Sequence, residues 1–191
     1  MNKAAKILTT YIMKKDMIKQ EECELYEFGF QAALEKGLYI IISLFIAAQL
    51  HMIIEGLLFF LVFIPLRSYA GGLHLKHYYA CLVLSCLTFL FVLLAGKYAA
   101  NLFGLSIIPV GILANFVWLL HPIDCRNRME DENEEKYFKK QLKKFLMIDM
   151  FITVICIVFK RNTYVSVTFY TFFITVITMV IGKYKNYLDN I

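Results

Sequence analysis

The sequence predicts an all-α, polytopic membrane protein with about six transmembrane helices and an N-terminal amphipathic interfacial helix. First, 60% of the 191 residues are hydrophobic and the mean hydropathy is +0.62, whereas soluble domains contain about 45–50% apolar residues. One small core cannot bury this excess, so lipid has to accommodate it. Second, apolar runs of roughly membrane-crossing length alternate with short charged segments. No Gly/Ser-rich or Pro-rich linker interrupts the chain.

Residues 1–36 have the pattern of an amphipathic helix. Ile7, Leu8, Tyr11 and Ile12 recur at helical spacing, and lysines cover the other sides. Such a segment lies in the headgroup layer and is attracted to anionic lipid. A small soluble helix packed on the bundle is the alternative. We therefore divide the chain into this segment, 1–36, and a six-helix transmembrane domain, 37–191.

The region from 37 to 66 is too long for one span, since about 20 residues cross a bilayer. It is interrupted by Gln49, His51 and Glu55, which predicts a tight hairpin of two short spans. The later apolar runs predict four more spans, and Asp149 falls within the fifth. The six predicted spans are 37–49, 52–66, 79–96, 98–120, 145–159 and 163–182.

The basic residues predict the orientation. With six spans, 17 Lys and Arg residues fall on the side of the termini and three fall on the other side. The positive-inside rule then places both termini and the 67–78 and 121–144 loops in the cytoplasm. The last of these loops mixes acidic and basic residues at helical spacing, which indicates a solvated helix leading into the fifth span. Because the positive charge is explained in this way, we do not expect nucleic-acid binding.

The five cysteines are odd in number and have no repeated spacing, which argues against a disulfide framework or a zinc ribbon. They are Cys23, Cys81, Cys86, Cys125 and Cys156. Cys86 and Cys156 lie within predicted spans, where a cysteine packs as a small apolar residue.

The segment from Arg67 to Cys81, RSYAGGLHLKHYYAC, carries the groups best suited to chemistry. Gly71 and Gly72 permit positive φ, so the helix of the second span is expected to break there. Cys81 falls in the first turn of the third span, where unpaired N–H groups create positive potential. A cysteine attacks as its thiolate, and a histidine can accept the proton and return it to a leaving amine. A Cys/His acyl-transfer site is therefore possible.

Either of two histidines can serve as the partner of Cys81. On a continuous helix His74 lies about 10 Å from Cys81 along the axis, whereas His77, four residues before it, can touch it. His74 becomes the partner only if residues 71–78 bend back. A metal site formed by His74, His77 and Cys81 is a further alternative, although no fourth protein ligand is evident.

The chain resembles the accessory gene regulator protein B (AgrB) family, the membrane peptidases of Gram-positive quorum sensing. The resemblance covers length, N-terminal helix, six spans and the pattern Arg67…Gly72, Leu73, His74…Cys81. In that family a histidine seven residues before a cysteine forms the catalytic pair, which implies His74 and Cys81 here. Arg67 and Gly72 match other characteristic positions of the family. Because His74 reaches Cys81 only if the chain between them bends back, the loop 71–78 is expected to bend.

A second match is the segment from His121 to Arg128, HPIDCRNR, which resembles the Pro-containing turn that follows the family's fourth span. Many relatives have another proline where this chain has Met129. Asp124 is a candidate to orient the histidine. Arg126 and Arg128 are candidates to hold an acidic peptide tail. The other interpretation is that all three are ordinary charges of a cytoplasmic loop.

The resemblance implies a membrane cysteine endopeptidase that cleaves the C-terminal tail of an AgrD-type precursor, a quorum-sensing propeptide, through an acyl-enzyme thioester. Ring closure to a thiolactone or lactone then releases the product. No metal and no cofactor is expected. The resemblance also implies a homodimer in the cell membrane of a Gram-positive bacterium. A peptide exporter or transporter without a covalent step is the alternative. It requires charges deep in the spans, where only Glu55 and Asp149 qualify, both close to predicted span ends.

Overall fold

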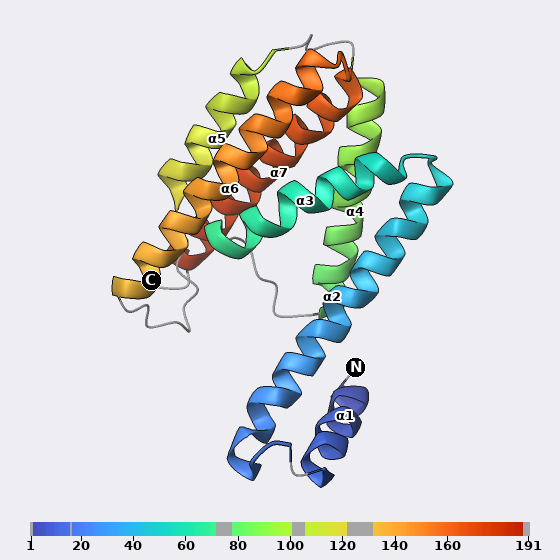
Figure 1. Ribbon diagram of the computed structural model, residues 1–191, viewed down its shortest axis with the longest axis vertical. Helices are drawn as coiled ribbons and strands as arrows, with labels where there is room; N and C mark the ends of the chain where they lie inside the picture. The colour runs from blue at the N-terminus through green and yellow to red at the C-terminus, as the bar shows by residue number, and fades with distance from the viewer. Residues whose placement is uncertain (1, 16, 72–77, 101–105, 122–131, 189–191) are drawn as a thin grey trace. The chain divides into compact units, whose positions relative to one another are not determined.

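The computed structural model describes residues 2–15, 17–71, 78–100, 106–121 and 132–188, and these residues form only helices and their connections (Figure 1). The chain divides into two compact units, Met1–Ile46 and Ala47–Ile191. The predicted all-α class is confirmed.

The first unit contains α1 (Asn2–Lys14), the short 3₁₀ helix η1 (Gln20–Glu22) and most of α2 (Cys23–Gln49). Helix α1 is held to α2 by Lys6, 4.0 Å from Glu27, and by the Cys23 thiol, 3.4 Å from the Met13 sulfur. Apolar side chains of α1 nevertheless remain exposed, with Ile7 at 69%. An exposed apolar stripe beside lysines is the pattern of an interfacial helix, but α1 covers only Asn2–Lys14 of the predicted segment 1–36, and its location at a membrane surface stays a prediction. Helix α2 runs through residue 36 without a break, and the division at that residue stays a prediction.

Helix α2 ends at Gln49, where the sequence predicted a break between two spans; the predicted hairpin packing of those spans stays a prediction. His51 has a positive φ of 55°, and the Met52 N–H donates to the Ala47 carbonyl across 2.8 Å. The second unit continues through five helices, which are α3 (Ile53–Ala70), α4 (Tyr78–Tyr98), α5 (Ile108–Leu120), α6 (Glu132–Val158) and α7 (Asn162–Leu188).

Helix α7 is the centre of the second unit, since it packs against α3, α4, α5 and α6. Its buried face carries hydroxyl and small residues as well as apolar ones, and Thr168, Thr171 and Thr175 each donate to the carbonyl four residues earlier. These local bonds satisfy the hydroxyls without a partner helix. Small and hydroxyl residues let membrane helices approach closely.

Four helices among the described residues are long and apolar enough to cross a membrane, and they cover Gln20–Gln49, Ile53–Ala70, Ala80–Tyr98 and Asn162–Lys185. Helix α5 is apolar but shorter, since it begins at Ile108 and not at the predicted residue 98. Helix α6 joins the charged segment and the fifth apolar run in one continuous helix, as predicted. The chain is therefore an all-α membrane protein.

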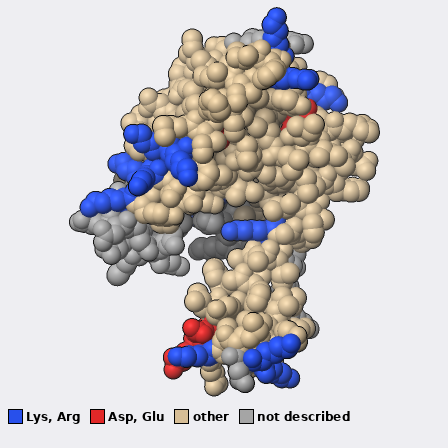
Figure 2. All heavy atoms as spheres, viewed as in Figure 1, with Lys and Arg blue, Asp and Glu red and all other residues tan. Residues whose placement is uncertain are grey.

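Successive helices of the second unit alternate in direction, so its charges divide between two ends. Figure 2 shows Lys and Arg side chains of this unit gathered toward its ends, with mostly uncharged residues between them. Because of the alternation, one end of the unit brings together parts of four helices (Figure 1). These are the end of α3, the start of α4, the end of α5 and the lysine-rich half of α6. Lys97, Lys160 and Arg161 belong to the opposite end. Which end faces the cytoplasm remains a prediction from the charge count.

Candidate active site at the start of helix α4

The predicted helix break lies at Gly71. Helix α3 ends at Ala70, and Gly71 has φ 80° and ψ −163°. That region of backbone space is available almost only to glycine, because a Cβ would clash with the neighbouring peptide. The Arg67 guanidinium donates from Nη1 to the Gly71 carbonyl at 3.2 Å. Arg67 thus caps the last turn of its own helix and fixes the direction in which the chain leaves it.

The end of α3 is held against helix α6. The Tyr69 ring stacks on Phe145, with centroids 5.3 Å apart and an interplanar angle of 17°, and it lies 5.9 Å from the Phe138 ring. Leu66 and Ala70 on the same turn of α3 belong to the buried core that α5, α6 and α7 share. The position of Gly71 is therefore set by the bundle. Sequence reasoning missed Tyr69, although an aromatic residue between Arg67 and Gly71 was a visible signal.

Cys81 lies in the first turn of α4, as predicted. Its thiol is free and its side chain is partly exposed. The first four N–H groups of a helix have no partner within the helix, and their partial positive charge stabilises an anion placed there. Cys81 is thus a reduced sulfur at a helix N-terminus, at the same end of the unit as Gly71.

Five of the predicted site residues lie outside the described residues: Gly72, His74, Asp124, Arg126 and Arg128. Their roles stay predictions, as does the choice between His74 and His77. Helix α4 as described begins at Tyr78, after both histidines. Within the described part of the chain no three His, Cys, Asp or Glu side chains could hold a metal ion. That observation does not test a site containing His74 and His77.

The sequence places Asp149 near the end of a predicted span, and the structure buries its side chain inside the bundle. It is only 2% exposed, in the middle of α6, and its Oδ2 atom has no hydrogen-bond partner among the described residues. The Thr153 hydroxyl donates to the Asp149 backbone carbonyl and leaves that carboxyl oxygen unsatisfied. The Asp149 carboxyl group is therefore enclosed by the bundle, whereas its depth relative to the membrane surface stays a prediction.

Comparison with known proteins gives one family and two similar relatives. A family model described as "Accessory gene regulator B" matches residues 5–179. A protein of Clostridium perfringens (strain 13 / Type A) named "Putative AgrB-like protein 2" is 23% identical over 167 residues, which cover 83% of this chain and 78% of that protein. A second, from strain SM101 / Type A and named "Putative AgrB-like protein", is 26% identical over 166 residues, with the same coverage of 83% and 78%. No solved structure matches the chain.

Proposed function

Since the chain belongs to the accessory gene regulator B family, which acts in the processing of quorum-sensing autoinducers, we propose that it is a membrane-embedded cysteine endopeptidase. Its substrate is an AgrD-type precursor with an amphipathic N-terminal helix and an acidic C-terminal tail. Cys81 is the nucleophile and His74 is the general base. The observation that carries this proposal is the free Cys81 thiol in the first turn of α4, next to the linker that carries His74.

The reaction has two acyl transfers. His74 takes the proton of Cys81, and the thiolate attacks the carbonyl that joins the signal segment to the tail. His74 then protonates the leaving amine and the tail departs, which leaves a thioester on Cys81. An internal cysteine or serine of the precursor attacks this thioester, and the ring closes as a thiolactone or lactone while Cys81 regains its proton.

The residues around Cys81 support this chemistry. Backbone N–H groups at the start of α4 are the candidates to bind the oxyanion. Arg67 fixes the Gly71 carbonyl and so the beginning of the linker. A site at the membrane boundary keeps water from the thioester, which would otherwise be hydrolysed to a linear product. Asp124 as orienting group, and Arg126 and Arg128 as contacts for the acidic tail, belong to the same proposal.

We place the site and both termini on the cytoplasmic side of the cell membrane of a Gram-positive bacterium, because the positive-inside rule favours that orientation. The proposal includes a homodimer. The first half of α4 leaves Val83 56% exposed and Leu84 42% exposed, which is surface available to a second copy.

The test is cleavage of a synthetic precursor by the protein in nanodiscs, followed by mass spectrometry. Cys81→Ala should abolish release of the tail, whereas Cys86→Ala, a matched change five residues later on the same helix, should retain it. His74→Ala should reduce tail release by at least about a hundredfold, the usual size of a general-base contribution. Full processing by Cys81→Ala would exclude the nucleophile. Loss of activity with His77→Ala instead of His74→Ala would assign the base to His77, and loss on addition of a chelator would indicate a metal site.

Asp149 favours a second candidate function, a peptide exporter without covalent catalysis. An ionisable side chain buried in a membrane bundle often marks a transport pathway, and Asp149 is 2% exposed with an unsatisfied oxygen. In proteoliposomes, an exporter would move preformed cyclic peptide and Asp149→Asn would stop it. The peptidase requires no such transport, and Asp149→Asn should retain tail release.

A further inference from the structure

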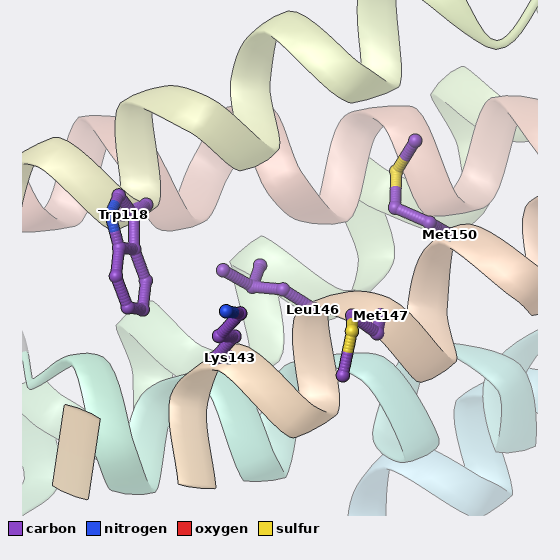
Figure 3. A pocket seen from close by; sticks show the side chains of 5 residues that line it. All are labelled: Trp118, Lys143, Leu146, Met147 and Met150. Atoms are coloured by element: carbon purple, nitrogen blue, oxygen red, sulfur yellow. The ribbon is translucent and has the colours of Figure 1, made fainter. Parts of the chain in front are cut away.

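An open groove runs along the seam between α5 and α6. It has a volume of about 440 Å³ and is lined by Trp118, Lys143, Leu146, Met147 and Met150. Figure 3 shows Trp118 and Lys143 at one end of the groove and Met150 at the other. The lining residues on α6 run from Lys143 to Met150, a separation of seven residue positions and thus about 10 Å along the helix axis. Met147 is 59% exposed, so the groove opens on the outside of the bundle.

Positive charge is concentrated at one end of this groove. Lys143 lines the groove, and Lys139, one turn earlier on α6, has its Nζ 5.6 Å from the centre of the Trp118 ring. Neither lysine makes an ion pair with any carboxylate whose side chain the structure describes. Beyond this end the lining is apolar: Leu146, Met147 and Met150 carry no hydrogen-bond donor.

We propose that the α5–α6 groove binds one anionic phospholipid, with its phosphate at Lys139 and Lys143 beside the Trp118 ring and an acyl chain along Met147 and Met150. The groove is basic at one end and apolar along the rest of its length. A ligand with one anionic end and one long apolar end matches this arrangement. The charged half of α6 precedes its apolar half, so the basic end lies where headgroups lie and the other end lies at acyl-chain depth. Indole rings and basic pockets between transmembrane helices suit this level of the bilayer.

An acidic peptide fits the groove less well. An extended peptide presents backbone N–H and C=O groups along its whole length, and each needs a polar partner in an apolar environment. The lining supplies only the Lys143 ammonium and the Trp118 indole N–H, both at one end. The lipid proposal does not depend on the proposed peptidase activity, because it concerns residues outside the Gly71–Cys81 region.

Trp118 makes the proposal directly measurable, because it is the only tryptophan in the chain. Its fluorescence is quenched by lipid whose acyl chains carry bromine. The protein is placed in nanodiscs of phosphatidylcholine with a small fraction of brominated phosphatidylglycerol, or with the same fraction of brominated phosphatidylcholine. We expect brominated phosphatidylglycerol to occupy the groove roughly tenfold more favourably than brominated phosphatidylcholine, because two lysines near the membrane surface together supply a preference of that order for anionic lipid.

Two double variants distinguish the effect of the groove lysines on lipid preference from the effect of general surface charge. Lys139→Gln with Lys143→Gln should reduce the preference to near parity. Lys140→Gln with Lys144→Gln removes the same charge from exposed positions on the same helix and should leave the preference intact. Equal quenching by the two brominated lipids in the wild type would overturn the proposal. An equal loss in both double variants would also overturn it, because it would assign the effect to diffuse charge.

Two competitors identify the occupant. Soluble glycerol phosphate at millimolar concentration should leave the quenching unchanged, since a headgroup without a chain forgoes the apolar half of the groove. A synthetic acidic peptide should likewise have no effect. Relief of quenching by glycerol phosphate would reassign the site to a phosphate ion, and relief by the peptide would reassign it to a peptide. Either result would overturn the proposal.

Discussion

The two halves of helix α4 differ in how the rest of the chain covers them. Between residues 80 and 88 no side chain is buried, and Cys81 lies at this end. In the second half, Phe89, Val92 and Leu93 are completely buried. The same apolar helix thus provides scaffold at one end and an uncovered surface at the other. The proposed nucleophile, Cys81, belongs to the exposed half.

Close packing explains the buried half. The Phe89 ring stacks on Phe60 and meets Phe59 edge to face, with centroids 5.3 Å and 5.2 Å apart. At Gly96, an added Cβ would lie 2.5 Å from Val167 Cγ2 on helix α7. Glycine at this position lets two helices approach closely, as at many membrane helix contacts. The uncovered half has no comparable contact among the described residues.

The largest expected effect separates two leucines of α4. Leu93→Ala should lower the free energy of unfolding by about 3 kcal/mol, because Leu93 is 0% exposed and its removal leaves a cavity. Leu84→Ala, the same chemical change at a side chain 42% exposed, should cost less than about 1 kcal/mol. Unfolding in micelles with an increasing fraction of dodecyl sulfate, followed by Trp118 fluorescence, measures both. An equally large cost at Leu84 would contradict the comparison and indicate that another chain covers this half.

A smaller loss is expected at the contact between α4 and α7. Gly96→Ala forces Val167 to move and should cost about 1–3 kcal/mol. Gly111→Ala is the matched control, because its Cβ would meet only the Met150 methyl group at an ordinary 3.6 Å. The control should be neutral or slightly stabilising, since alanine favours helix more than glycine does. If the two variants unfold alike, Gly96 is not required for the close approach.

The next effect concerns Gly71, which follows α3 and precedes the exposed first half of helix α4. Gly71→Ala places a Cβ at φ 80°, which should cost about 1–2 kcal/mol of local strain. Because Gly71 lies after the end of α3 and not within a helix, we expect a small loss of global stability and an approximately tenfold slower release of the precursor tail. Gly37→Ala, at a position where nothing lies within 4 Å of the added Cβ, should leave both unchanged. Normal tail release by Gly71→Ala would show that the linker geometry does not control the reaction.

The sequence predicted the membrane class, the helix break near residue 51, the break at Gly71 and the place of Cys81 because each depends on local chemistry. Apolar length, glycine and helix start signals act within a few residues. The predicted length of α5 was wrong because the run from 98 to 120 contains no charged residue, so hydropathy does not mark the start at Ile108. The local signals were overlooked: Pro109 lies in the first turn, and the Ile108 N–H donates to the Ser106 hydroxyl oxygen. The contacts of Tyr69 and Asp149 were missed because they depend on how separate helices pack. Sequence spacing does not determine that packing.

The pairing of His74 with Cys81 was inferred from a resemblance, whereas helical spacing alone favoured His77. The lipid groove could not have been predicted from the sequence either, because Trp118 and Lys143 lie 25 positions apart in the chain. The exposure of each half of α4 is a tertiary property in the same sense: both halves are similarly apolar, and only the packing of α3 and α7 distinguishes them.

The smallest expected effect tests what Arg67 contributes at the uncovered end. Arg67→Lys keeps the charge but loses the guanidinium that donates to the Gly71 carbonyl, a bond worth about 0.5–1.5 kcal/mol. Tail release should slow several-fold. If Arg67 only positions the linker, kcat falls by the same factor for precursors with an acidic tail and for those with glutamine in place of glutamate. If Arg67 also binds the tail, the acidic precursor alone shows a raised KM, because lysine cannot reproduce the planar fork that holds a carboxylate. We expect the first result, since the Gly71 carbonyl already engages the Arg67 side chain.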